Sequence, residues 1–142
     1  GKVLACDIQS TATVFPPNVE FHQEDVFQRS EAFERQLAET GPFHVVMSDM
    51  APQTTGTKFT DQARSLELCL EALAVAEKYL VKGGSFVVKI FMGPDVGELL
   101  KGMRPRFARV TSFKPQSSRM ESKETFFVGL GFKGREAESV RD

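Results

Sequence analysis

Two periodicities of hydrophobic and polar positions alternate along the chain and predict short strands separated by helices. Short runs that are apolar or alternate in polarity have the length and composition of strands. Apolar residues spaced three and four apart predict helices between these runs. The predicted strands are 3–6, 19–22, 43–49, 85–91, 109–113 and 124–132, and the predicted helices are 30–41, roughly 62–82 and roughly 95–105.

The order of these elements favours an α/β domain. Strands alternate with helices at the spacing of strand–helix–strand units, which is typical of a mostly parallel sheet with helices on both faces. Ser30 is the expected N-cap of the first helix and Gly41 its end, and Asp61 is expected to cap the second helix. We expect 1–134 to belong to this domain and 135–142 to form a polar tail.

The stretch 43–52 (FHVVMSDMAP) stands out because an apolar strand ends in a carboxylate. Val45, Val46 and Met47 predict a strand buried on both faces, as in the interior of a parallel sheet. Asp49 follows directly, and Pro52 ends regular structure. Open α/β sheets bind their ligands at the carboxyl ends of their strands, so Asp49 is a candidate site residue.

Asp7 and Asp25 also follow apolar strands and are expected at the same edge of the sheet. A carboxylate in such a position typically accepts hydrogen bonds from the ribose hydroxyls of a nucleotide-like cofactor, which suits Asp7. Asp25 could accept a hydrogen bond from an exocyclic amine such as that of adenine. Taken singly, each also has the alternative of an ordinary turn aspartate.

Lys89 lies inside the apolar run 87–91 (VVKIF) and therefore needs an anionic partner or must lose its proton. Desolvation lowers the pKa of a lysine toward the range in which it can act as a base. The alternative is a side chain that extends past the strand end into water. Glu124 opens the last strand and, taken alone, is an ordinary solvated glutamate.

Composition excludes several classes of protein. In its 142 residues the chain has no apolar run long enough to cross a membrane and no signal-peptide pattern. Cys6 and Cys69 are too few for a disulfide scaffold and are expected to be small buried residues. His22 and His44 are isolated, so neither a histidine-based triad nor a metal site is expected. Oligomeric state leaves no signal in the sequence.

Charge is distributed unevenly, although the net charge is only −1. Residues 1–100 contain 8 Lys/Arg and 14 Asp/Glu, whereas 101–135 contain 9 Lys/Arg and 2 Asp/Glu. A basic segment of this kind can bind a polyanion, and it can equally be a solvated surface.

Taken together, these motifs resemble the FtsJ/RrmJ ribosomal RNA 2′-O-methyltransferases. The resemblance covers nearly the whole chain and includes the order and spacing of the segments. The matching segments are ACD (5–7), QED (23–25), SDMAP (48–52), TGT (55–57), DQARSL (61–66), VVKIF (87–91) and SSRMESKETFFV (117–128).

The resemblance implies a Rossmann-like, S-adenosyl-L-methionine-dependent enzyme that methylates a ribose 2′-hydroxyl in 23S-type large-subunit ribosomal RNA. The last strand of that fold is antiparallel to the others. The family's catalytic Lys–Asp–Lys–Glu set places its Asp on Asp49, its second Lys on Lys89 and its Glu on Glu124. Cofactor contacts would come from Asp7, Asp25 and Asp49. The implied partner is ribosomal RNA or the large ribosomal subunit.

The resemblance implies further that Arg119 and Lys123 contact RNA, and that the enzyme works in the cytoplasm, or in the mitochondrion if eukaryotic. The family's first strand, glycine-rich loop and first catalytic Lys would precede Gly1. Without that strand the sheet should have a gap between the strands that end at Asp7 and Asp49. We therefore expect these 142 residues alone to be inactive.

Two other functions are compatible with the sequence. One is a non-catalytic RNA- or nucleotide-binding module of Rossmann-like fold. The other is a small-molecule methyltransferase or NAD-dependent dehydrogenase, against which Lys89 and the basic segment 101–135 argue.

Overall fold

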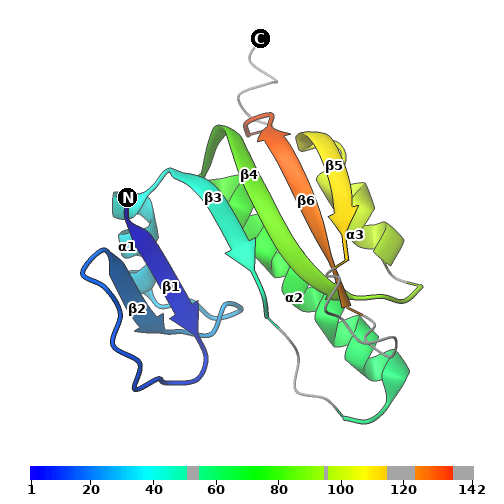
Figure 1. The fold of residues 1–142 in the computed structure, drawn as a ribbon, viewed down its shortest axis with the longest axis horizontal. Helices are drawn as coiled ribbons and strands as arrows, with labels where there is room; N and C mark the ends of the chain where they lie inside the picture. Colours follow the sequence, from blue (N-terminus) through cyan, green and yellow to red (C-terminus); the bar gives the residue numbers. More distant parts are fainter. Residues whose placement is uncertain (51–54, 95, 115–123, 136–142) are drawn as a thin grey trace. The chain divides into compact units, whose positions relative to one another are not determined.

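The computed structural model describes the chain apart from residues 51–54, 95, 115–123 and 136–142. The elements follow one another in the predicted order, β-β-α-β-α-β-α-β-β (Figure 1). They group into two compact units, Gly1–Pro42 and Phe43–Asp142.

The first unit consists of β1 (Val3–Asp7), β2 (Val19–Gln23) and α1 (Glu31–Thr40). The two strands pair in parallel. α1 begins where predicted, because the Ser30 hydroxyl accepts a hydrogen bond from the backbone N–H of Phe33. Phe33 and Leu37 form its buried side, which confirms the apolar face predicted from their spacing.

The second unit consists of β3 (Phe43–Ser48), α2 (Lys58–Tyr79), β4 (Leu80–Phe91), α3 (Val96–Met103), β5 (Phe107–Phe113) and β6 (Glu124–Phe132). Its strands form one sheet in the order β3-β4-β6-β5. β3 is parallel to β4, whereas β6 is antiparallel to both of its neighbours. The expected antiparallel last strand is thereby confirmed.

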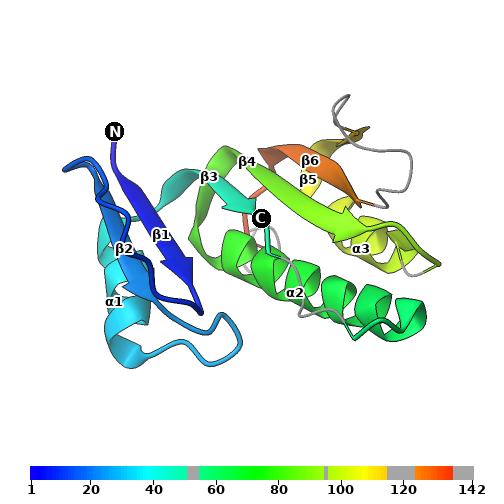
Figure 2. The same cartoon turned by 60° about the horizontal axis from the view of Figure 1, so that its bottom comes forward.

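α2 and α3 cover the same face of this sheet (Figure 2). Their apolar sides share one core with β4, β5 and β6. That core contains Cys69, Ala72, Leu73, Ala76, Leu80, Phe86, Val88, Ile90, Leu99, Met103, Phe107, Phe127 and Phe132. The expectation of helices on both faces is therefore not met within the described part of the second unit.

The prediction that 45–47 are buried on both faces is wrong for two of the three residues. Val45 is 50% and Met47 73% exposed. In the described chain β3 pairs with β4 alone, so it is an edge strand, and these two side chains point away from the helix-covered face. The described strands form two sheets instead of one, so the expected break between β1 and β3 is observed.

The second helix differs from its predicted bounds at both ends. It begins at Lys58 and ends at Tyr79. The next residue, Leu80, already belongs to β4, because it pairs with Phe43 of β3. Asp61 lies within its first turn instead of preceding it. The Asp61 carboxylate accepts hydrogen bonds from the backbone N–H and the hydroxyl of Thr55, both at 2.9 Å, and so ties the preceding loop to the helix.

The two cysteines differ in their surroundings. Cys69 is buried at 1% exposure, as expected, whereas Cys6 is exposed, so the expectation is wrong there. Within the described residues, no helix combines the length and apolar character needed to cross a membrane.

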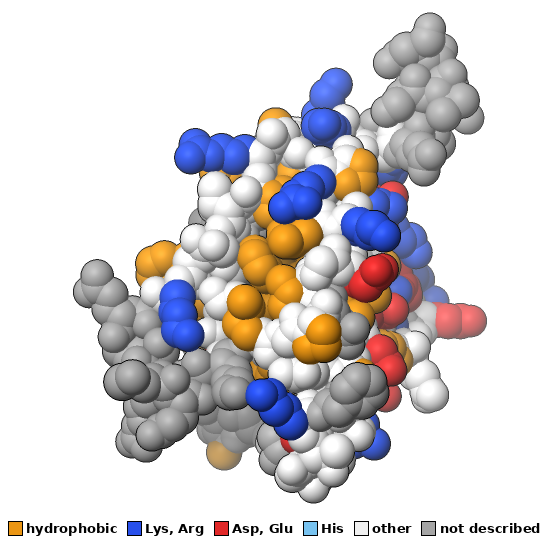
Figure 3. Space-filling model, turned by 90° about the vertical axis from the view of Figure 1, so that its right-hand side faces the viewer, with side chains coloured by type: hydrophobic (Ala, Val, Ile, Leu, Met, Phe, Trp, Pro, Cys, Tyr) orange, Lys and Arg blue, Asp and Glu red, His pale blue; other side chains and the backbone are white. Residues whose placement is uncertain are grey.

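Several cations of the basic segment 101–135 lie on the surface of the second unit. Figure 3 shows Lys and Arg side chains spread over one side of the molecule, with Asp and Glu gathered toward one edge of the view. Arg106 forms a salt bridge with Glu77, with 2.9 Å between Nε of the arginine and Oε2 of the glutamate. The exposed members of this set among the described residues include Lys101, Arg104, Arg109 and Lys133.

Gly129 is a packing requirement of the core. A Cβ there would lie 2.7 Å from Cγ of Phe107. Phe107 is 2% exposed, and the centroid of its ring is 6.1 Å from that of Phe86 and 5.6 Å from that of Phe132. We expect Gly129→Ala to lower the free energy of unfolding by about 1–3 kcal/mol, because the ring has no space into which to move. Chemical denaturation measures this.

Gly97→Ala is the matched control, since a Cβ on Gly97 in α3 meets nothing within 4 Å. It should stabilise by roughly 0.5–1 kcal/mol through helix propensity. Equal unfolding free energies for the two variants would contradict the packing role of Gly129.

Candidate active site

Lys89 of β4 lies between two carboxylates. Its Nζ is 2.7 Å from Oδ1 of Asp49 and 2.9 Å from Oε2 of Glu124. The three residues that the family resemblance proposes as catalytic are thus in direct contact. The alternative of a lysine that reaches water without a partner is wrong.

Strand direction explains the contact. Ser48 pairs with Val88 in the parallel β3–β4 ladder, so Asp49, one residue later, lies beside Lys89. β6 runs the opposite way and begins at Glu124, which pairs with Phe91. Since paired residues and residues two apart share one face of a sheet, Glu124 projects on the same face as Lys89.

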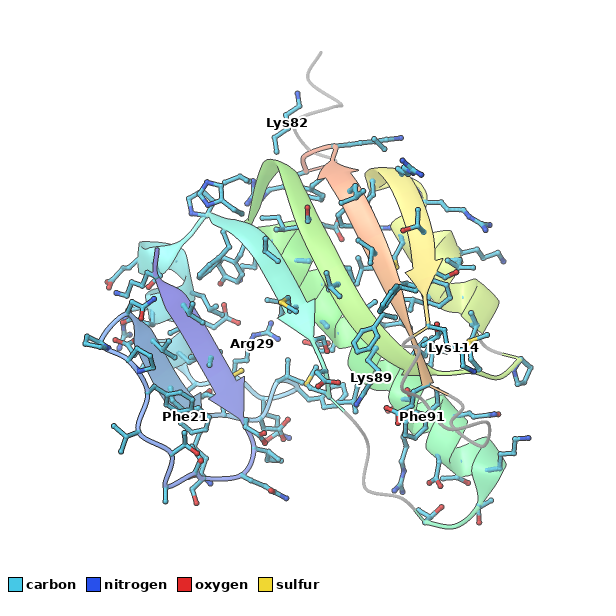
Figure 4. All side chains as sticks on the ribbon, in the orientation of Figure 1. Phe21, Arg29, Lys82, Lys89, Phe91 and Lys114 are labelled. Carbon is cyan, nitrogen blue, oxygen red and sulfur yellow. The ribbon has the colours of Figure 1, made fainter. Side chains whose placement is uncertain are left out.

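Within the cluster the ammonium is shielded from solvent, whereas one of the carboxylates is largely exposed. Lys89 is 16% exposed, Glu124 39% and Asp49 76%. Figure 4 shows Lys89 near the carboxyl end of β4, close to the end of β3. A ligand can therefore approach Asp49 from solvent and reach a lysine that is itself shielded.

The two carboxylates decide the protonation state of Lys89. Burial lowers its pKa, but the hydrogen bonds and charges of Asp49 and Glu124 raise it by more, so the pKa lies above its ordinary value. Of the two expected states, the lysine with an anionic partner is confirmed, and the lysine whose pKa falls far enough for it to lose its proton is not. The resting site contains an ammonium ion held by two anions, and not a free amine.

Asp7 and Asp25 belong to the first unit, where Asp7 is the last residue of β1 and Asp25 lies two residues after β2, at the carboxyl edge of that sheet. Oδ1 of Asp7 accepts a hydrogen bond from the backbone N–H of Gln9 at 3.0 Å, and Oδ1 of Asp25 one from Phe27 at 2.9 Å. Both residues thus make the turn contacts of the simpler alternative. A carboxylate has further acceptor capacity, so these bonds orient the groups without excluding a ligand.

Arg119 and Lys123 lie outside the described residues. Sequence reasoning missed three residues near the cluster, Gln62, Ser65 and Cys69 of α2, which bond to the backbone of β4 or to the residue that follows it. Among the described residues, no group of three or more His, Cys, Asp or Glu side chains could hold a metal ion.

The fold and the cluster define an α/β protein of the Rossmann-like class I methyltransferase type. A crystal structure of a Plasmodium falciparum protein described as a ribosomal RNA methyltransferase matches with a TM-score of 0.78 at 25% identity, over 94% of this chain and 74% of that one. A Streptococcus mutans protein described as a methyltransferase, in complex with SAH, matches over 92% of this chain and 72% of its own with a TM-score of 0.56. Its 15% identity supports the fold alone.

The chain belongs to the FtsJ-like methyltransferase family, whose model matches residues 1–132. Ribosomal RNA large subunit methyltransferase E of Nitratidesulfovibrio vulgaris (strain Miyazaki F) is 73% identical over 134 residues, which are 94% of this chain and 67% of that protein. The protein of the same name from Bdellovibrio bacteriovorus is 48% identical over 136 residues, 94% of this chain and 68% of that protein. The chain thus spans about two thirds of the length of these relatives.

We expect Asp49→Asn and Glu124→Gln each to lower the pKa of Lys89, because each removes an anionic hydrogen-bond partner. A folded-state pKa that is raised stabilises the fold below the ordinary lysine pKa, and this contribution is lost as pH rises through the raised value. Titration of the Lys89 side chain by ¹³C NMR measures the shift. Glu98→Gln, on the exposed face of α3, is the control, and an unchanged Lys89 pKa in both test variants would contradict the pairing.

Proposed function

We propose that the full-length protein transfers a methyl group from S-adenosyl-L-methionine to a ribose 2′-hydroxyl of large-subunit ribosomal RNA of the 23S type. The observation that carries the proposal is the contact of Lys89 with Asp49 and Glu124. The family match and the names of the relatives support the substrate class.

The residues present fit the cofactor. Asp7 and Asp25 supply oriented carboxylates at the end of neighbouring parallel strands, which is the chemistry that ribose hydroxyls and an exocyclic amine require. Asp49, the most exposed member of the cluster, is the third proposed cofactor contact. When bound, S-adenosyl-L-methionine supplies an electrophilic methyl group on a sulfonium ion.

In this proposal Lys89 acts as an ammonium ion. It donates a hydrogen bond to O2′, orients that oxygen and stabilises the negative charge that grows as the hydroxyl loses its proton. The proton would leave the hydroxyl as O2′ forms the new C–O bond and the methyl–sulfur bond breaks to give a neutral thioether, so a carboxylate suffices as the proton acceptor. Asp49 and Glu124 keep the ammonium in place, and one of the two carboxylates accepts that proton.

The RNA is held through its phosphates by the basic segment 101–135. Arg119 and Lys123 are among the proposed RNA contacts. Exposed Lys101, Arg104 and Arg109 add positive charge to the surface of the second unit. We place the enzyme in the cytoplasm, where its bacterial relatives would meet ribosomal subunits. The methyl-transfer chemistry of the family requires no metal.

The function is tested with full-length protein, labelled S-adenosyl-L-methionine and large ribosomal subunits that lack the modification. We expect methyl transfer to a single ribose, located by mapping of the modified nucleotide. Tight RNA binding without transfer would instead support the non-catalytic binding module.

Lys89→Ala should reduce kcat by roughly 10²–10⁴-fold or more, because the transition state loses its positioned hydrogen-bond donor. Affinity for S-adenosyl-L-methionine should stay nearly unchanged. Steady-state methyl transfer and calorimetric titration measure the two quantities. Lys82→Ala, an exposed lysine near the other end of β4, is the matched control, and turnover retained by Lys89→Ala would remove Lys89 from the catalytic role.

The pH dependence of the single-turnover rate distinguishes the ammonium from the free amine. Because the pKa of Lys89 is raised, the ammonium persists through neutral and mildly alkaline pH. We expect a rate that is flat between roughly pH 7 and 9 and falls as Lys89 loses its proton. A rate that climbs tenfold per pH unit over this range would show that the free amine is the active form.

A further inference from the structure

The carboxyl end of β4, which contains Lys89, extends beyond the strand that pairs with it on one side. The β3–β4 ladder ends at Ser48 and Val88, whereas β4 continues to Phe91. On its other side β4 remains paired with β6 as far as Glu124. Backbone groups of β4 after Val88 therefore need partners other than β3.

One stripe of α2 supplies such partners. Sγ of Cys69 donates to the carbonyl of Lys89 at 3.1 Å, and Oγ of Ser65 accepts from the N–H of Phe91 at 3.0 Å. Nε2 of Gln62 donates to the carbonyl of Met92 at 2.7 Å. These three residues follow one another at spacings of three and four, so they lie on one face of the helix.

Burial and a close contact show that this stripe is built into the fold. Gln62, Ser65 and Cys69 are 8%, 1% and 1% exposed. A Cβ on Gly93 would lie 2.5 Å from Cδ of Gln62, so the side-chain amide of Gln62 packs directly against the backbone at Gly93. Burial raises the pKa of the Cys69 thiol to about 12, so it remains a neutral donor.

We infer that Gln62, Ser65 and Cys69 are positioning residues that hold the backbone of β4 so that Lys89 meets both carboxylates and the substrate oxygen. The inference rests on the proposed catalytic role of Lys89. It assigns α2 a part in catalysis beyond core packing. A lysine side chain is long and flexible, so its Nζ is placed to a few tenths of an ångström only if the strand beneath it is fixed.

The test uses full-length protein and a steady-state methyl-transfer assay. Ser65→Ala combined with Cys69→Ala removes two of the backbone contacts. We expect kcat to fall about 10–100-fold, since small misplacements of a catalytic group have effects of this size, with KM for the cofactor within about twofold. The N–H of Phe91 should also exchange its hydrogen faster, measured by NMR.

Two single variants isolate one donor. Cys69→Ser keeps a hydrogen-bond donor toward the carbonyl of Lys89, and Cys69→Ala removes it. We expect Cys69→Ser to retain more of the wild-type kcat than Cys69→Ala at equal stability. This pair decides the question even if the double variant does not fold.

Ala76→Gly controls for stability, because Ala76 is buried on α2 but lies two turns beyond Cys69. Its kcat should equal that of wild type wherever the protein is folded. The inference is overturned if the Ser65/Cys69 variants, folded and with faster exchange at Phe91, have the kcat of Ala76→Gly. Turnover retained by Lys89→Ala in the same assay would instead overturn the proposed role of Lys89, which is a distinct result.

Discussion

A largely buried ammonium ion has to be paired, and this requirement links the ends of three strands. Lys89 contacts Asp49 from the end of β3 and Glu124 from the start of β6. Removal of either carboxylate would leave the lysine with less compensation for its lost hydration. The cluster therefore holds the ends of three strands of the second unit together, and it is also the part of that unit best suited to chemistry.

The topology of the sheet makes the contact between Lys89 and the two carboxylates possible. Parallel strands bring their carboxyl ends to one edge, and an antiparallel strand brings its amino end to the same edge. β6, antiparallel to β4, thus places a residue from far along the chain beside Lys89. β3 stops one residue before Asp49, and α2 supplies hydrogen bonds to β4 where β3 no longer does.

Much of this arrangement was predictable from the sequence. The order of the nine elements in the described part of the chain follows from periodicity. A lysine inside the apolar run VVKIF requires a partner for its charge. The identity of the partners came from the family resemblance, because composition alone cannot pair Asp49 with Glu124 across the sheet. The cofactor contacts of Asp7 and Asp25 stay a prediction.

Other features depend on distances or neighbours that a single sequence does not contain. The raised pKa of Lys89 is the balance of opposing contributions from burial and two carboxylates, and its sign requires the geometry. Val45 and Met47 are apolar yet exposed, because β3 is an edge strand in the described chain. Ser65 and Cys69 give no signal, since small residues on the inner side of a helix normally indicate packing alone.

The central claim is that Asp49 and Glu124 act through Lys89. A double-mutant cycle on the single-turnover rate of the full-length protein tests it most directly, with Asp49→Asn and Glu124→Gln made in the wild-type and Lys89→Ala backgrounds. The account predicts that each carboxylate variant slows a wild-type enzyme strongly and has almost no further effect once Lys89 is absent. Rate losses that multiply independently in the two backgrounds would contradict it.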